Sequence, residues 1–120
     1  MSFETRMVAL LNVGAITALV GPRVYALEAP PETRAPFVVW QRITSSVERT
    51  HDGADTQDIL VQVSCYAETY AATCALREAV RTALDLGDAE GRTLLRDTRD
   101  SKEQERDLYR SDIDFDVWQA

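Results

Sequence analysis

Two runs rich in β-branched and aromatic residues, Pro36–Ile43 and Ile59–Tyr66, constrain the fold of this chain more than any other feature. Such residues suit a pleated strand, and Pro36 can occupy a strand's first position without losing a ladder hydrogen bond. The second run alternates and places one set of apolar side chains on a single face: Ile59, Val61, Val63 and Cys65. The pattern therefore predicts two strands, the second of them half-buried.

The segment between these strands, Ser45–Gln57, reads as a connection. It contains Asp52-Gly53, a strong local turn signal, but it is longer than the common hairpin loop of two to five residues. We therefore expect a long loop with a functional or mobile character.

Two helices are predicted, one before and one after the strand pair in the sequence. Ser2 can cap a helix over Phe3–Val20, and Thr69 can cap a second one that ends near Leu86, with Gly87 in the position that favours a left-handed cap. Gly14 lies inside the first helix, so either another element approaches the backbone there or the glycine is simply tolerated.

The rest of the chain supplies a connector and two further strands. Arg23–Ala35 reads as an extended connector that can begin with a short strand at Val24–Leu27. Arg92–Arg99 is predicted as a strand and Asp100–Asp107 as a charged turn. The run Ser111–Trp118 alternates strictly, which makes it the clearest strand of the chain.

The order of these elements, α-β-β-α-β-β, predicts an α+β fold. We expect a mainly antiparallel four-stranded sheet with two helices packed on one face, in a single domain over residues 1–120. A chain of 120 residues buries enough surface for one core.

Composition excludes several classes of function. The net charge of −7, from 20 acidic and 13 basic residues, disfavours binding to nucleic acid, because an acidic chain gains nothing from counterion release. No apolar run approaches the roughly 20 residues of a membrane span, and the N-terminus lacks the layout of a secretory leader. We therefore expect a protein made and retained in the cytoplasm, without a membrane partner.

Cys65 and Cys74 fall on differently oriented surfaces, which predicts two free thiols.

Few residues suggest chemistry. Three aspartates alternate along the last strand, Asp112, Asp114 and Asp116. Carboxylates in a row on one strand do not converge on a cation, so a solvated or interface-facing surface is expected there. His51 stands beside Asp52 without a motif that would supply a nucleophile. No catalytic, metal or cofactor site is therefore predicted, and no cofactor is expected.

Trp40 and Arg42 share a strand face opposite Phe37 and Val39, so both faces of that strand carry large groups. Either one face contacts a partner, or Trp40 packs under the connector.

Several stretches of the chain, in order and over nearly its whole length, resemble the tail completion or tail terminator family of long-tailed bacteriophages. They are Val20–Tyr25, Ala35–Ile43, Val61–Tyr70, Arg106–Tyr109 and Asp112–Trp118. The motifs are patterns of fold and packing and not of chemistry. Members of this family also occur in prophages and in gene transfer agents.

The resemblance implies a structural protein and no catalysis. It implies a homo-hexameric ring at the head-proximal end of the virion tail, which stops growth of the tail tube and joins the head. The implied partners are further copies of the chain, the major tail tube protein and a head-completion or stopper protein, while DNA passes through the ring without specific binding. The alternatives are a monomeric head–tail connector or adaptor and a small enzyme that uses His51.

Two sets of candidate contact residues follow. The subunit or tube interface is expected to include Trp40, Arg42, Arg106, Asp107, Leu108 and Tyr109. The acidic groups expected to face the DNA channel are Glu48, Asp52 and Asp55, because an acidic wall does not retain phosphates. The strand aspartates would then pair with arginines such as Arg42 or Arg96 across strands or subunits.

Overall fold

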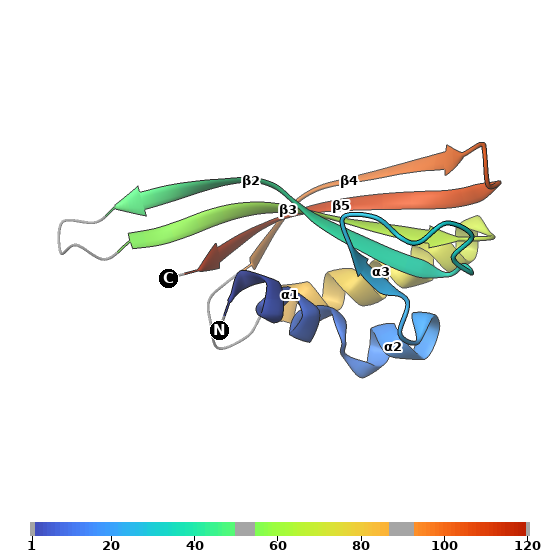
Figure 1. Ribbon diagram of the computed structural model, residues 1–120, viewed down its shortest axis with the longest axis horizontal. Coiled ribbons are helices and arrows are strands. Elements are labelled where there is room, and N and C mark those ends of the chain that lie inside the picture. Colours follow the sequence, from blue (N-terminus) through green and yellow to red (C-terminus); the bar gives the residue numbers. More distant parts are fainter. Residues whose placement is uncertain (1, 50–54, 87–92, 120) are drawn as a thin grey trace.

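Five strands form one mixed sheet, and three helices lie on one of its faces (Figure 1). The computed structural model describes residues 2–49, 55–86 and 93–119. The elements in chain order are α1 Phe3–Leu11, α2 Gly14–Val20, β1 Val24–Ala26, β2 Phe37–Arg49, β3 Asp55–Ala67, α3 Tyr70–Leu86, β4 Thr93–Glu103 and β5 Leu108–Gln119.

The strands follow the spatial order β1-β2-β3-β5-β4. β1 runs parallel to β2, and the other neighbours pair antiparallel. The predicted α+β fold with a mainly antiparallel sheet and helices on one face is therefore confirmed. The predicted numbers of strands and helices, four and two, are wrong. The additional strand is β1, which confirms the short strand considered at Val24–Leu27 but left out of the count of four, since three residues are too few to stand out by periodicity.

The first predicted helix, Phe3–Val20, is in fact two helices. α1 ends at Leu11, α2 begins at Gly14, and their axes are bent by 74°. Asn12 caps the end of α1, and the extended backbone of Val13 precedes α2. The break allows both helices to place side chains in the same core, because Leu11 and Ile16 are each fully buried.

Gly14 does not mark a close approach. A Cβ atom added to Gly14 would meet nothing within 4 Å, so the expected contact with another element is wrong and the simpler alternative, tolerance of the glycine, holds. No single described helix is long and apolar enough to cross a membrane; only α1 and α2 taken together pass on length and composition, and they are bent.

α3 matches its prediction closely. It begins after Thr69, whose Oγ1 accepts a hydrogen bond from the Ala72 N–H at 3.1 Å. Its inward side chains Leu76, Val80 and Leu84 are buried against the sheet. Gly87, the predicted left-handed cap, lies outside the described residues.

The main core lies between the sheet and the helices. The alternation predicted for β3 and β5 is confirmed, because the inward side chains are fully buried: Ile59, Val61, Val63, Cys65, Ile113, Phe115 and Val117. Both cysteines are free, with Cys65 in this core and Cys74 half-buried on α3.

A smaller cluster lies on the other face of the sheet, at the end near the β4–β5 turn. Phe37, Val39 and Leu108 are buried there, packed against residues of the connector between β1 and β2. The ring of Phe37 stacks on that of Tyr66 with centroids 4.6 Å apart. The connector thus covers part of a face that the helices leave open.

The predicted long loop Ser45–Gln57 is mostly strand. β2 continues to Arg49 and β3 begins at Asp55, with paired residues up to Arg49 opposite Asp55. The segment has few apolar residues, so cross-strand pairing and not hydrophobic periodicity holds it extended. Similarly, β4 continues to Glu103, so the predicted charged turn is shorter than expected.

Candidate assembly surfaces

Trp40 packs into the chain's own core. Its side chain is 6% exposed, and its ring meets that of Phe3 in α1 edge to face, with centroids 6.0 Å apart. The placement of Trp40 under the connector, one of two alternatives from the sequence, is therefore wrong, because α1 covers this residue. The same burial leaves little of Trp40 for a partner to contact.

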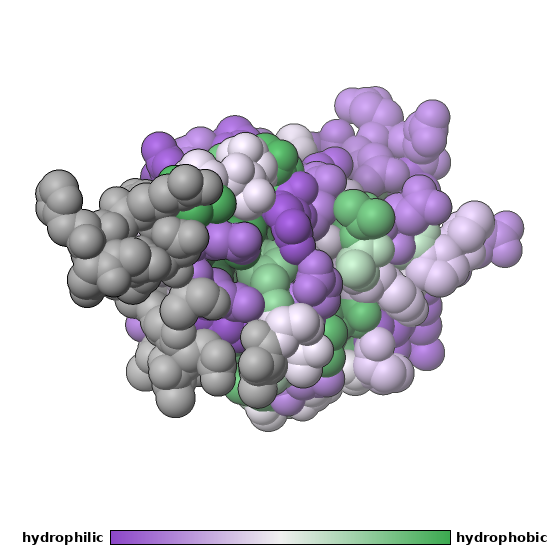
Figure 2. Space-filling model, turned by 60° about the vertical axis from the view of Figure 1, so that its left-hand side comes forward, coloured by the Kyte–Doolittle hydropathy of each residue, from purple (hydrophilic) through white to green (hydrophobic). Residues whose placement is uncertain are grey.

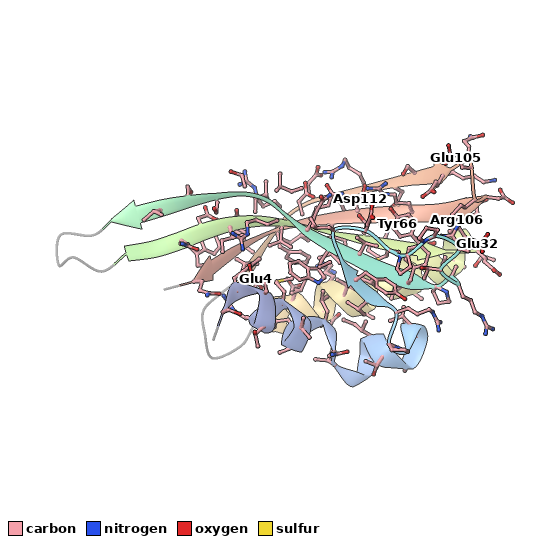
Figure 3. The ribbon with its side chains drawn as sticks, in the orientation of Figure 1. Glu4, Glu32, Tyr66, Glu105, Arg106 and Asp112 are labelled. Carbon is pink, nitrogen blue, oxygen red and sulfur yellow. The ribbon has the colours of Figure 1, made fainter. Side chains whose placement is uncertain are left out.

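Arg42, two residues further along β2, is exposed and held in place. Its guanidinium lies 4.9 Å from the centre of the Phe3 ring, and its Nη2 lies 2.6 Å from Oε1 of Glu4. Arg42 therefore pairs with α1 and not with the aspartates of β5, which corrects one expectation. Arg42 and Glu4 are both exposed, so this ion pair lies at the protein surface. Figure 3 labels Glu4 on α1.

The turn between β4 and β5 holds the other candidate interface residues. Arg106 lies over the Phe37 ring at 5.4 Å and donates a hydrogen bond to the Thr33 carbonyl, which ties the turn to the connector (Figure 3). Leu108 is buried below it. Asp107 adopts a positive φ of 56° and lies 3.0 Å from Lys102 Nζ.

Tyr109 follows on the helix-covered face, where its ring lies 6.0 Å from that of Tyr70. Of these four candidate residues, Arg106 and Asp107 in the turn are exposed, whereas Leu108 and Tyr109, the first residues of β5, are buried and half-buried. The turn therefore presents a fixed charged tip on an apolar base.

The aspartates of β5 form a ladder of ion pairs on the face opposite the helices. Three arginines pair with them: Arg110 with Asp112 at 2.7 Å, Arg99 with Asp114 at 2.8 Å and Arg96 with Asp116 at 3.2 Å. The expected pairing with Arg96 is confirmed, within one chain. The hydrogen bonds that Arg99 donates to Asp114 and then to Asp97 raise the pKa of its guanidinium above the usual value. The ladder is largely charge-neutral, so it is not an acidic wall.

Asp100 joins β4, β5 and α3, which the sequence did not predict. Its carboxylate accepts hydrogen bonds from Ser111 Oγ and Tyr70 Oη, each at 2.7 Å, and from Arg77 Nη1 at 3.1 Å. The hydrogen bond from Ser111, then that from Tyr70, holds the pKa of Asp100 below its usual range. A usable signal was its alternation with Thr98, which puts Asp100 on the inward face of β4.

The candidate channel residues lie at the far end of the β2–β3 hairpin. Glu48 pairs with Thr56 in the strand register, and Asp55 pairs with Arg49. Asp52 lies outside the described residues, as does His51. Within the described ranges, no group of three or more His, Cys, Asp or Glu residues is placed to hold a metal ion.

Hydrophobic side chains reach the surface in separate patches among hydrophilic ones (Figure 2). Four large exposed ones lie at the two edges of the sheet and on its hairpin: Leu27 at 72%, Leu94 at 56%, Val47 at 53% and Ile43 at 46%. Others lie on helices, including Tyr70 at 49% and Val8 at 48%. Exposed apolar residues scattered singly are common on protein surfaces, so their position on the sheet and not their exposure alone bears on an interface.

Comparison with known proteins agrees with this picture of a structural chain. Residues 7–120 match the family described as "Tail completion protein gp17". No curated protein matches. Among solved structures, a chain of the "Virion of native gene transfer agent (GTA) particle" has the same fold, with a TM-score of 0.74 and 21% identity over 98% of this chain and 94% of that one. Because the family match spans almost the whole sequence, the chain belongs to the tail completion protein gp17 family and is a structural protein of the virion tail, not an enzyme.

Proposed function

We propose that six copies of the chain form a ring at the head-proximal end of the tail tube. There the ring stops tube polymerisation and provides the surface that joins the head. The observation that carries this proposal is the family match over residues 7–120. The chain with the same fold adds support, since it comes from the virion of a gene transfer agent particle.

The distribution of exposed apolar groups supports a ring. Ile43 and Val47 lie on the part of β2 that β1 does not pair with, and Leu94 lies in β4 at the opposite edge, with exposed fractions of 46%, 53% and 56%. Two different patches on opposite sides suit a heterologous contact, in which each copy uses one patch to meet the other patch of the next. Repeated rotation then closes such contacts into a ring.

The partners are further copies of the chain, the major tail tube protein and a head-completion or stopper protein. Arg42 beside α1 and the charged tip at Arg106 and Asp107 are exposed and held by contacts within the chain, so they offer preorganised groups to these partners. Trp40 and Leu108 support these groups from below, because both are buried.

The ring would also be a conduit for DNA. We place Glu48, Asp52 and Asp55 at its lumen, since they lie on or next to the far ends of β2 and β3 and because the β5 aspartates are already paired with arginines. Phosphates passing an acidic wall gain nothing from counterion release, so the DNA is not retained.

Deletion of the gene tests the role. We expect filled heads together with tails of irregular, excessive length that remain unattached, and a plasmid copy should restore attached tails of normal length. Electron microscopy of the particles gives both readouts. Attached tails of normal length without the gene would contradict the role, and density for a single copy within assembled tails would instead favour a monomeric head–tail connector.

A further inference from the structure

The sheet has two free edges. β1 pairs with only Val38–Trp40 of β2, so from Gln41 to Arg49 no described strand lies on that side of β2. At the opposite edge, β5 is the only strand of the described residues that pairs with β4. Free edges present backbone N–H and C=O groups that can pair with another strand.

Charged side chains, which hinder pairing with another strand, cover only part of each edge strand. β4 carries a run of charged residues from Arg96 to Glu103, but Thr93–Leu95 has none. On β2, the stretch Ile43–Val47 is also uncharged. Proteins commonly place charged side chains on edge strands to prevent pairing, so the two uncharged stretches are the ones left open to it.

The two uncharged stretches lie at the same level of the sheet. The strand registers place Thr44 opposite Leu60, Leu60 opposite Asp116, and Asp116 opposite Leu94. Thr44 and Leu94 are thus the two outermost residues of one line of neighbouring residues that crosses the sheet. Residues in one row share a face, so both side chains point to the side away from the helices.

The directions of the strands are also compatible. β2 is antiparallel to β3, β3 to β5, and β5 to β4, so β2 and β4 run in opposite directions. If two copies lie side by side with the helices on the same side, β4 of one meets β2 of the next in antiparallel orientation, with the uncharged stretches level.

We propose that the ring closes through these edges: Ile43–Val47 of β2 in one copy pairs antiparallel with Thr93–Leu95 of β4 in the next. The inference rests on the ring proposed above and names its subunit contact. The occupant of each edge is a second copy of this chain, because the chain itself carries both edges with matching level, opposite direction and exposed apolar residues. Leu94, 56% exposed, is covered by the hairpin of the neighbour.

Cross-linking within assembled tails tests the contact. In a Cys74→Ala chain, which leaves only the buried Cys65, we introduce Thr44→Cys together with Leu94→Cys and treat purified tails with a short bifunctional thiol reagent. Side chains directly opposite on paired strands have Cβ atoms about 4.5–5.5 Å apart, within reach of such a reagent. We expect a denaturing gel to show a ladder of multiples of the 13.4 kDa chain.

Two further variants complete the experiment. Thr44→Cys with Leu19→Cys is the matched control, because Leu19 is also a large exposed residue but lies on α2. It should stay a monomer on the gel. Ser46→Cys with Leu94→Cys would cross-link if the two strands pair with Ser46, and not Thr44, opposite Leu94.

The outcomes separate the contact from the ring. Rings visible in the tails without a ladder from either the Thr44 or the Ser46 pair would overturn the edge contact and leave the ring standing. Cross-links from Thr44→Cys to the tube protein would overturn it as well. Tails with a single copy of the chain would overturn both proposals.

Discussion

The guanidinium of Arg96 lies 3.2 Å from the carboxylate of Asp116, across the β4–β5 pair and on the sheet face that the helices leave open. The Asp116 side chain is only 9% exposed, while that of Arg96 is 55% exposed. A carboxylate taken so far out of water depends on this partner.

Arg96→Ala should therefore lower the free energy of unfolding by roughly 1–2 kcal/mol, less than for a fully buried pair because Arg96 is half in solvent. Urea unfolding measures this, and Arg96→Lys, which retains the charge, should recover part of the loss. Equal stability of Arg96→Ala and the unchanged protein would mean that water replaces the arginine.

Asp100 should make the fold sensitive to acid. Its pKa is lowered by the hydrogen bond from Ser111 and then by that from Tyr70, so its contribution is complete above the ordinary aspartate pKa of about 3.9 and is lost as the pH falls through the lower folded value. In Asp100→Asn, we expect lower stability at pH 7 and a shallower decline between pH 5 and pH 2. Parallel unfolding curves for the two proteins over that range would contradict this role.

Cys65 should make the fold sensitive to alkali. Burial, with a smaller contribution from Asp112, raises the pKa of its thiol, so the folded state keeps a proton that the unfolded state releases. Stability is then complete below the ordinary thiol pKa of about 8.5 and declines as the pH rises above it. Cys65→Ala should weaken that decline in urea unfolding at pH 7 to 10, measured against Cys74→Ala.

Cys65→Ser should destabilise the fold more than Cys74→Ser. The first places a hydroxyl in the fully buried core, at a cost of about 1–3 kcal/mol if it finds no partner, whereas Cys74 is half-buried. Equal losses in the two variants would show that the core accommodates the hydroxyl. Thiol titration of the unfolded, unreduced protein should find both cysteines free.

Gly14→Ala should raise the free energy of unfolding by up to about 1 kcal/mol, because alanine lowers the conformational entropy of the unfolded chain. Gly14 is the first residue of α2, and an added Cβ there meets nothing within 4 Å, so the folded state accepts the methyl group. Gly21 provides the contrast. Its φ of 58° disfavours any side chain, so Gly21→Ala should be destabilising. Thermal unfolding that moved both variants in the same direction would contradict this assignment.

Reversal of Glu48, Asp52 and Asp55 to lysine tests the channel. Tails should keep their normal length, while DNA delivery slows or stops because basic groups bind the passing phosphates, and added salt should ease the defect. Reversal of Glu68, Glu78 and Asp85, three exposed residues on or just before α3, is a control of equal charge change away from both the hairpin and the β4–β5 turn. Unchanged infectivity of the first variant, with the ring present, would remove the hairpin from the channel.

The sequence alone determined those features that depend on residues close together in the chain, such as which strand side chains are buried and where a helix begins. The strict alternation of Ile113, Phe115 and Val117 predicted their full burial, and Thr69 predicted the start of α3. The arginine partner of Asp116 could also be anticipated, because opposite charges on neighbouring strands attract.

Only the tertiary structure decided the rest, since those features depend on contacts between distant segments. The polar stretch Ser45–Gln57 has no strand periodicity, yet β2 and β3 hold each other extended in its described parts, up to Arg49 and from Asp55 on. The helix over Phe3–Val20 breaks after Leu11, where Asn12, Val13 and Gly14 are weak helix formers. The apolar spacing on both sides hides this local signal, and only the packing of Ile16 and Val20 in the core shows that the chain bends there. The alignment of the β2 and β4 edges likewise arises from three successive strand registers, which no single stretch of sequence contains.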